Sequence, residues 1–90
     1  MMLTRDGDIL KVAGPMNIAS AAGLLNQSNG MLSTVNIVDL AEVTEIDSAA
    51  VSLLLEWRRQ ANGSTLRFTN LPAALKSLAE LYGVTDLIPQ

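Results

Sequence analysis

The feature that most constrains this chain is a run of aliphatic residues at 35–40 that leads, through an acidic segment, into an apolar helix. Residues 35–40 are nearly continuous in β-branched and aliphatic side chains, which is typical of a central strand covered on both faces. The helix is predicted to begin at Asp47 or Ser48 and to run to Ala61, with Asn62-Gly63 as its stop signal. A short acidic loop therefore delivers a serine hydroxyl to the start of an apolar helix.

Successive residues of a helix lie 100° apart, so the predicted helix has distinct faces. The side predicted to be buried carries Ala50, Val51, Leu54, Trp57 and Ala61. The opposite, polar side carries Ser48, Ser52, Glu56, Arg59 and Gln60. The polar side is bordered by Leu55 on one edge and by Ala49 and Leu53 on the other. Apolar residues beside a reachable serine indicate either a docking patch or an extension of the core.

The N-terminal part of the chain predicts a hairpin and a helix. Asp6-Gly7 separates two short apolar segments and predicts a tight turn with these two residues at its centre. Gly14-Pro15 is expected to end the second strand, and residues 28–30 to end the helix. The apolar residues that recur at helical spacing between them are Ile18, Ala21, Ala22 and Leu25.

The C-terminal part predicts one more strand and one more helix. Leu66 and Phe68 alternate with polar residues, as in a strand. Pro72 suits the first turn of the last helix, and Gly83 can close it. The buried stripe of this helix is expected to consist of Leu71, Ala74, Leu75, Leu78, Leu81 and Tyr82. The order β-β-α-β-α-β-α predicts an α/β fold whose mixed β-sheet has parallel neighbours joined by crossover helices.

Composition narrows the function. The 90 residues carry 6 Lys and Arg against 9 Asp and Glu, and no basic block that could bind a row of phosphates, so nucleic acid is not an expected partner. The absence of Cys and His removes the commonest zinc ligands and general base, so neither an enzyme nor a metal or other cofactor is expected. The sequence has no secretory signal pattern and no apolar run near the roughly 20 residues of a membrane span. A cytoplasmic protein without direct membrane insertion is expected.

Asp47 and Ser48 are the central candidate residues. Asp47 can cap the helix, an interaction that typically contributes about 1 kcal/mol. Ser48 gains little stability one step inside the helix and lies on its polar side, so its hydroxyl should be reachable by a partner. A phosphate there would be crowded by Asp47 and Glu45 and would act as an off-switch. Ser48 is not expected to be a nucleophile, because no His or Lys in this segment could serve as its base.

The order of these elements, the Val-Asp-Leu strand end at 38–40 and the Ile46-Asp47-Ser48 helix start resemble the signature of STAS domains. That family includes bacterial anti-sigma-factor antagonists and the small MlaB subunits of Mla phospholipid ABC transporters. The resemblance extends over essentially the whole chain. It implies one STAS-like domain at residues 1–90, with the helices packed mainly on one side of the sheet.

The two branches of the family imply different partners. In the antagonist branch, the serine that matches Ser48 is phosphorylated by an anti-sigma factor kinase; in the transporter branch, a Ser or Thr at this place contributes to contact with the ABC transporter ATPase subunit. The short chain, the sequence of residues 75–89, and Ala49-Ala50 after the serine favour the transporter branch, although both branches tend to have glycine after the hydroxyl residue.

The resemblance therefore implies a non-catalytic accessory subunit, cytoplasmic and peripheral to the inner membrane through its ATPase partner. The alternative is an anti-sigma-factor antagonist regulated by phosphorylation of Ser48, and a small sensor domain that binds a nucleotide or lipid is the third, weaker class. The residues expected to contact the partner are Asp47, Ser48, Ala49, Ser52, Leu55 and Glu56.

Overall fold

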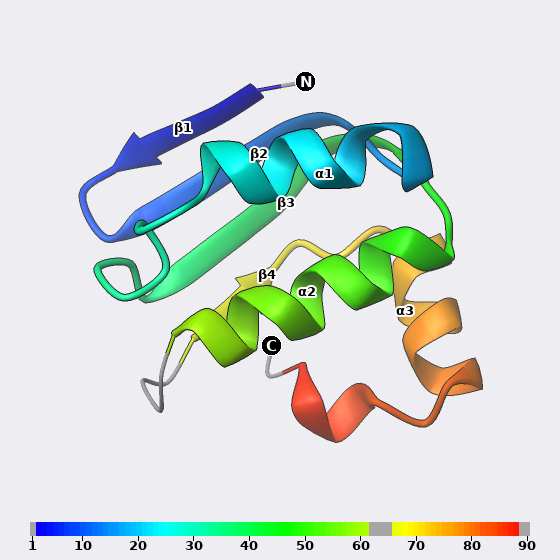
Figure 1. Ribbon diagram of the computed structural model, residues 1–90. Helices are drawn as coiled ribbons and strands as arrows, with labels where there is room; N and C mark the ends of the chain where they lie inside the picture. The colour runs from blue at the N-terminus through cyan, green and yellow to red at the C-terminus, as the bar shows by residue number, and fades with distance from the viewer. Residues whose placement is uncertain (1, 62–65, 89–90) are drawn as a thin grey trace.

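The computed structural model describes residues 2–61 and 66–88. Four strands form one sheet in the order β1-β2-β3-β4, in which β1 is antiparallel to β2 and the other neighbours are parallel. The α/β class with a mixed sheet and crossover helices is thereby confirmed (Figure 1). In chain order, the elements are β1 (Met2–Asp6), β2 (Ile9–Met16), α1 (Ile18–Gln27), β3 (Ile37–Ile46), α2 (Ser48–Gln60), β4 (Arg67–Thr69), α3 (Ala73–Leu81) and the short 3₁₀ helix η1 (Thr85–Leu87).

The helices cover one face of the sheet. Crossovers between parallel strands are almost always right-handed, so two successive crossovers that step in the same direction place both helices on the same face. Figure 1 shows α1 and α2 together in front of the strands. In β3, the side chains of Val38 and Leu40 are fully buried, whereas Ile37 and Asp39 are only half-buried. The prediction that this strand is covered on both faces is therefore wrong.

Strands β2 and β3 are both longer than predicted. Gly14-Pro15 does not end β2, because the strand continues to Met16, with a register shift between Gly14 and Pro15. This extension pairs with the acidic segment after residue 40, so β3 continues to Ile46. The predicted acidic loop is thus strand, and Asp47 alone separates β3 from α2. The extension of β3 is caused by its parallel pairing with β2, and no local signal in the sequence predicts this pairing.

The N-terminal hairpin is confirmed, but its turn lies one residue further along the chain. Asp6 pairs with Ile9, so the two central residues of the turn are Gly7 and Asp8 rather than Asp6 and Gly7. Gly7 has a φ of 63°. A positive φ at the first central position matches the type II′ turn, which prefers glycine there.

The core confirms the predicted buried side of α2 and corrects its border. Ala50, Val51, Leu54, Trp57 and Ala61 are all buried. Leu53, predicted to border the polar side, is only 2% exposed and belongs to the core. The predicted stop signal at 62–63 lies outside the described residues.

The first helix forms as predicted, but the apolar residues at helical spacing do not mark its buried side. The residues of α1 that are buried are Ser20 and Leu24, whereas Ile18 is 78% exposed, Ala22 is exposed, and Ala21 and Leu25 are half-buried. This orientation of α1 is caused by hydrogen bonds at the start of the helix. Asn17 and Ser20 form a reciprocal capping box, and the Ser20 hydroxyl donates to the Pro15 carbonyl at 2.8 Å. These bonds turn Ser20 inward and leave Ile18 facing outward, with Ala21 and Leu25 only half-buried.

The end of α3 also differs from its predicted stripe. Leu71, Leu75 and Ala79 are buried and Leu78 is half-buried, but Ala74 is exposed, Leu81 is 75% exposed and Tyr82 is 51% exposed. Gly83, with a φ of 69°, closes the helix as predicted. The Val84 N–H donates to the Ala79 carbonyl, which reverses the chain in a Schellman motif. This reversal brings Val84 back toward the core and leaves the last turn of α3 outside.

Asp39 is expected to make folding stability depend on pH. Hydrogen bonds from the Asn70 side chain and the Ala41 N–H, together with the charge of Lys11, outweigh burial and lower the pKa of Asp39 from its usual 3.8. A depressed folded-state pKa stabilises the protein above the unfolded pKa, and this contribution is lost as the pH falls through the lowered value. The Asp39→Asn variant should therefore lose less stability than the wild type between about pH 5 and pH 3. Urea denaturation at each pH measures this, and identical pH slopes would contradict it.

Candidate functional site

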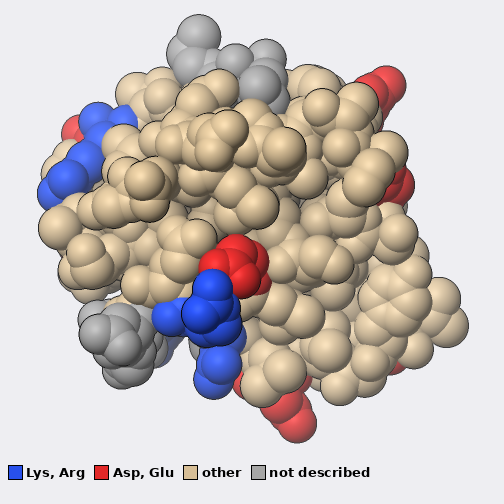
Figure 2. All heavy atoms as spheres, in the orientation of Figure 1, with Lys and Arg blue, Asp and Glu red and all other residues tan. Residues whose placement is uncertain are grey.

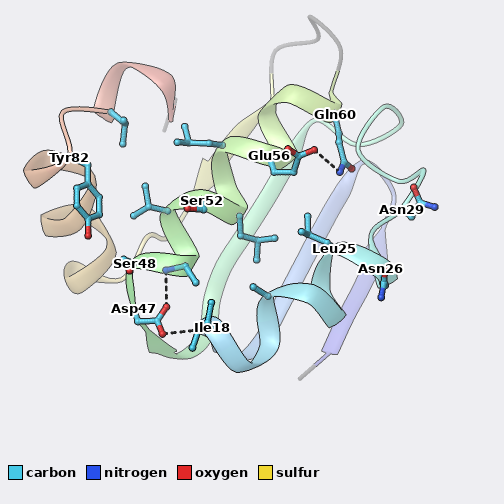
Figure 3. A pocket seen from close by; sticks show the side chains of 16 residues that line it. Ile18, Leu25, Asn26, Asn29, Asp47, Ser48, Ser52, Glu56, Gln60 and Tyr82 are labelled. Atoms are coloured by element: carbon cyan, nitrogen blue, oxygen red, sulfur yellow. Dashed lines mark hydrogen bonds between the residues drawn. The ribbon is translucent and has the colours of Figure 1, made fainter.

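An open trough of about 1230 Å³ follows the outer side of α2. Its floor is formed by the small residues Ser48, Ala49 and Ser52, of which both serines are exposed. Ser48 is the first residue of α2 and lies at one end of the trough, as Figure 3 shows. The other end is lined by Glu56 and Gln60. The prediction that the Ser48 side chain is exposed at the helix start is confirmed.

Two apolar walls flank this floor. One wall comes from α1 and includes Ile18, Ala21 and Leu25. The other comes from the segment after α3 and includes Tyr82 and Val84. Figure 3 shows Ile18 and Leu25 on one side of the serines and Tyr82 on the opposite side. We call this surface the α2 trough; its lining residues are Ile18, Ala21, Leu25, Asn26, Asn29, Asp47, Ser48, Ala49, Val51, Ser52, Leu53, Leu55, Glu56, Gln60, Tyr82 and Val84.

Asp47 connects the N-termini of two helices. One carboxylate oxygen accepts the Ala49 N–H at 2.8 Å and caps α2, as the sequence predicted. The other accepts the N–H of Ile18, the first residue of α1, at 3.0 Å. A second link joins the same helix start to β3, because the Asn17 side chain donates to Glu45 at 3.3 Å. These bonds hold α1 beside α2 and thereby set the width of the trough at the Ser48 end.

The charged side chains that line the trough are already compensated. Asp47 accepts two N–H groups from the first turns of α1 and α2, where the helix dipoles are positive. Glu56 accepts hydrogen bonds from Arg59 and from Gln60, and these bonds lower the pKa of Glu56. Both carboxylates therefore accept hydrogen bonds within the domain, and Glu56 is also paired with Arg59.

All six residues predicted to contact a partner line the α2 trough: Asp47, Ser48, Ala49, Ser52, Leu55 and Glu56. Sequence reasoning missed the walls, because it assigned Tyr82 to a buried stripe and used Ile18 and Leu25 only as evidence for a helix. Asn17 and Ser20, three residues apart before an apolar run, were a usable signal of the start of α1. The orientation of that helix depends on the Ser20 bond to Pro15, which lies outside the helix.

Neither a metal centre nor a membrane-spanning helix is found within residues 2–61 and 66–88. No cluster of three or more Asp and Glu side chains in these ranges is arranged to hold a metal ion. None of the helices in that part of the chain has the length and apolar character needed to cross a membrane.

A family model described as "Mlab, STAS domain" matches residues 2–89. This chain belongs to the STAS-domain family. Its fold agrees with a solved structure of the anti-sigma factor antagonist SpoIIAA in its unphosphorylated form. That comparison has a TM-score of 0.71 and 12% sequence identity, and covers 97% of this STAS domain and 84% of the other chain.

A second solved structure, described as a crystal structure analysis of Mglu, matches with a TM-score of 0.59 and 23% identity. It covers 80% of this STAS domain but only 20% of that longer chain. At these identities, both likenesses concern the fold alone. No curated protein sequence matches the chain.

Asp47 should contribute measurably to the stability of the STAS domain. Asp47→Ala removes both the cap of α2 and the bond to Ile18, and we expect a loss of about 1–3 kcal/mol in the free energy of unfolding. Asp47→Ser can still cap α2 but cannot reach both helices with one oxygen, so its loss should be smaller. Urea denaturation of the two variants measures the difference. Equal stability of Asp47→Ala and the wild type would contradict the role assigned to these bonds.

Proposed function

We propose that this STAS domain is an accessory subunit that binds and supports the ATPase of an Mla-type phospholipid ABC transporter. STAS domains are generally regulatory or accessory domains that act through protein–protein contacts. The observation that carries the proposal is the α2 trough, which joins the exposed Ser48 to apolar side chains that are exposed in the described part of the domain. The family match to MlaB-type domains supports the transporter as the setting. The protein would then be cytoplasmic and held at the inner membrane by its partner.

The exposure of large apolar side chains around the trough supports a protein partner. Ile18 and Tyr82 are each more than half exposed, and both line the trough. Exposed apolar patches of this kind mark interaction sites, since leaving them in water is unfavourable. A partner that covers Ile18 and Tyr82 would also enclose the Ser48 hydroxyl. The serine then contributes hydrogen bonds and specificity, and the walls contribute most of the affinity.

The second candidate function is an anti-sigma-factor antagonist that phosphorylation of Ser48 switches off. Two observations favour it: Ser48 is exposed, and the fold agrees with SpoIIAA, an anti-sigma factor antagonist. A phosphate on Ser48 would stand beside Asp47 and near Glu45, whose carboxylates oppose further negative charge. The intact mass of the protein from native cells distinguishes this candidate. An added phosphate supports the antagonist, and an unmodified mass under kinase-active conditions supports the transporter subunit.

Affinity capture of a tagged copy from its own organism tests the proposal. We expect an ABC ATPase to be recovered, whereas recovery of an anti-sigma factor kinase would establish the alternative. Leu55→Glu, which puts a charge on the half-buried border of α2, should abolish the capture. Ala22→Glu is the matched control, because Ala22 is exposed on α1 and does not line the trough. Circular dichroism should show that both variants are folded. Undiminished capture of the ATPase by Leu55→Glu would contradict the proposal.

A further inference from the structure

We propose that the α2 trough receives a single helix of the partner and that the contacting face of this helix is uncharged. The inference rests on the proposed partner-binding function and specifies what the partner contributes. Three properties of the trough carry it: its shape, its lack of free backbone groups and its compensated charges.

The dimensions of the trough suit a helix. The 13 residues of α2 extend over about 20 Å at 1.5 Å per residue. The lining residues of α1 follow at helical spacing, with Ile18, Ala21 and Leu25 on one side of the helix. A partner helix of about three to four turns would lie along the same length. Its anchors would recur at three- and four-residue intervals, as in other helix-in-groove contacts.

The floor of the trough permits close approach. Ser48, Ala49 and Ser52 have small side chains, and small residues allow two helix axes to come near the short end of the usual 8–10 Å. The higher walls, with Leu25 on one side and Tyr82 on the other, can then contact the flanks of the bound helix. The Ser48 and Ser52 hydroxyls lie where they can donate to side chains of its contacting face.

An extended partner segment would fit this surface less well than a helix. A bound strand needs backbone hydrogen bonds from a sheet edge, as in β-augmentation. The floor and one wall of the trough are the sides of α2 and α1, whose backbone groups are already bonded within the helices. A helix brings its own backbone bonds and offers only side chains, and the trough offers side chains in return.

The compensated charges determine the character of the contacting face. No Lys or Arg lines the trough, and its two carboxylates, Asp47 and Glu56, already have partners. Figure 2 shows mostly uncharged residues in the middle of this side of the molecule, with a cluster of acidic and basic atoms there and further charged atoms along its edges. An acidic residue of the partner would meet no Lys or Arg among the described lining residues, and a basic one would have to compete for carboxylates that already accept hydrogen bonds. An uncharged helix face avoids that cost.

A second copy of this chain is a poor occupant. Among the described residues, the exposed apolar side chains Ile18 and Tyr82 are walls of the trough itself, whereas Leu81 and Leu87 lie on two different elements and do not form one apolar helix side that could insert into another copy. Two identical troughs facing each other would both be concave and would leave space between them. The occupant is therefore a helix of a different protein.

Photo-crosslinking in the captured complex tests the inference. A benzophenone amino acid is placed at Leu25 or Asn26, on the α1 wall, and at Thr4, on the exposed strand β1, as a control. We expect the two wall positions, and not Thr4, to crosslink to one partner segment, which mass spectrometry identifies. That segment should be helical in the partner and carry no Lys, Arg, Asp or Glu on the side that reacts. Replacing a residue on that side of the partner segment by Glu should weaken capture at least about tenfold, since the substitution buries an unpaired charge.

Several outcomes would overturn the inference. Crosslinks to a second copy of the chain, to a strand, or to a charged helix face would each do so. The absence of wall crosslinks, in a complex that Leu55→Glu still abolishes, would overturn the inference while leaving the proposed function intact. If Leu55→Glu has no effect on capture, the proposed function itself fails.

Discussion

Replacing Trp57 by Ala is expected to lower the free energy of unfolding by about 3–5 kcal/mol. Trp57 is fully buried in the C-terminal half of α2, and it is the only Trp of the chain. Its Nε1–H donates to the buried Ser28 hydroxyl at 2.8 Å, and that hydroxyl in turn donates to the Leu25 carbonyl at 3.1 Å. The substitution therefore opens a large cavity and also breaks the link between α2 and the end of α1.

The loss expected for Trp57→Ala is a large share of the total free energy of unfolding. A 90-residue domain has a stability of roughly 5–13 kcal/mol, so Trp57→Ala should bring the protein close to unfolding at ordinary temperature. Trp57→Phe is the milder substitution. It removes the N–H donor but keeps an aromatic ring and most of the side-chain volume. We expect Trp57→Phe to lose clearly less than Trp57→Ala. Urea denaturation followed by circular dichroism measures both variants, and a loss below about 1 kcal/mol for Trp57→Ala would contradict the buried role of the ring.

A negatively or a positively charged side chain in place of Ser48 is expected to weaken partner binding by at least about tenfold. In the proposed complex, this position is enclosed by the walls of the trough, and Asp47 beside it already accepts two N–H groups. Ser48→Asp and Ser48→Lys should therefore both lose affinity, because the cost comes from removing an unpaired charge from water. Ser48→Ala removes only the hydroxyl and should lose at most about 1.5 kcal/mol.

A loss of affinity in Ser48→Asp should not be caused by unfolding of the domain. An Asp at the first position of α2 lies at the positive end of the helix dipole and should not destabilise the isolated domain. Ser77→Asp and Ser77→Lys are matched controls, because Ser77 is exposed on α3 and does not line the trough. Dissociation constants of the purified pairs, measured by calorimetry, provide the comparison. Full affinity in both charged Ser48 variants would show that the partner does not cover this position, and a loss in Ser48→Asp alone would point to repulsion by an acidic partner.

Much of the fold was predictable because several signals are local. The alternation of Leu66 and Phe68 with polar residues, the glycine that closes α3 at Gly83 and the buried side of α2 all depend on neighbours within one element. The same holds for the exposed serine after a capping Asp47. Within a helix, the direction of each side chain follows from its position, so the helical spacing placed five of the six candidate contact residues on one surface, and the cap position placed Asp47 beside them.

The tertiary structure decided what lies beside that surface. Ile18, Leu25 and Tyr82 have the spacing of core residues, and their sequence neighbours do not distinguish a helix side that faces the sheet from one that borders an open trough. The orientation of α1 follows from the Ser20 bond to Pro15, and the exposure of Tyr82 follows from the chain reversal at Gly83. The length of β3 likewise depends on its pairing with β2. Local chemistry in the sequence determined the elements and the serine, whereas contacts between residues distant in the chain determined the walls, because only those contacts fix how one element is oriented against another.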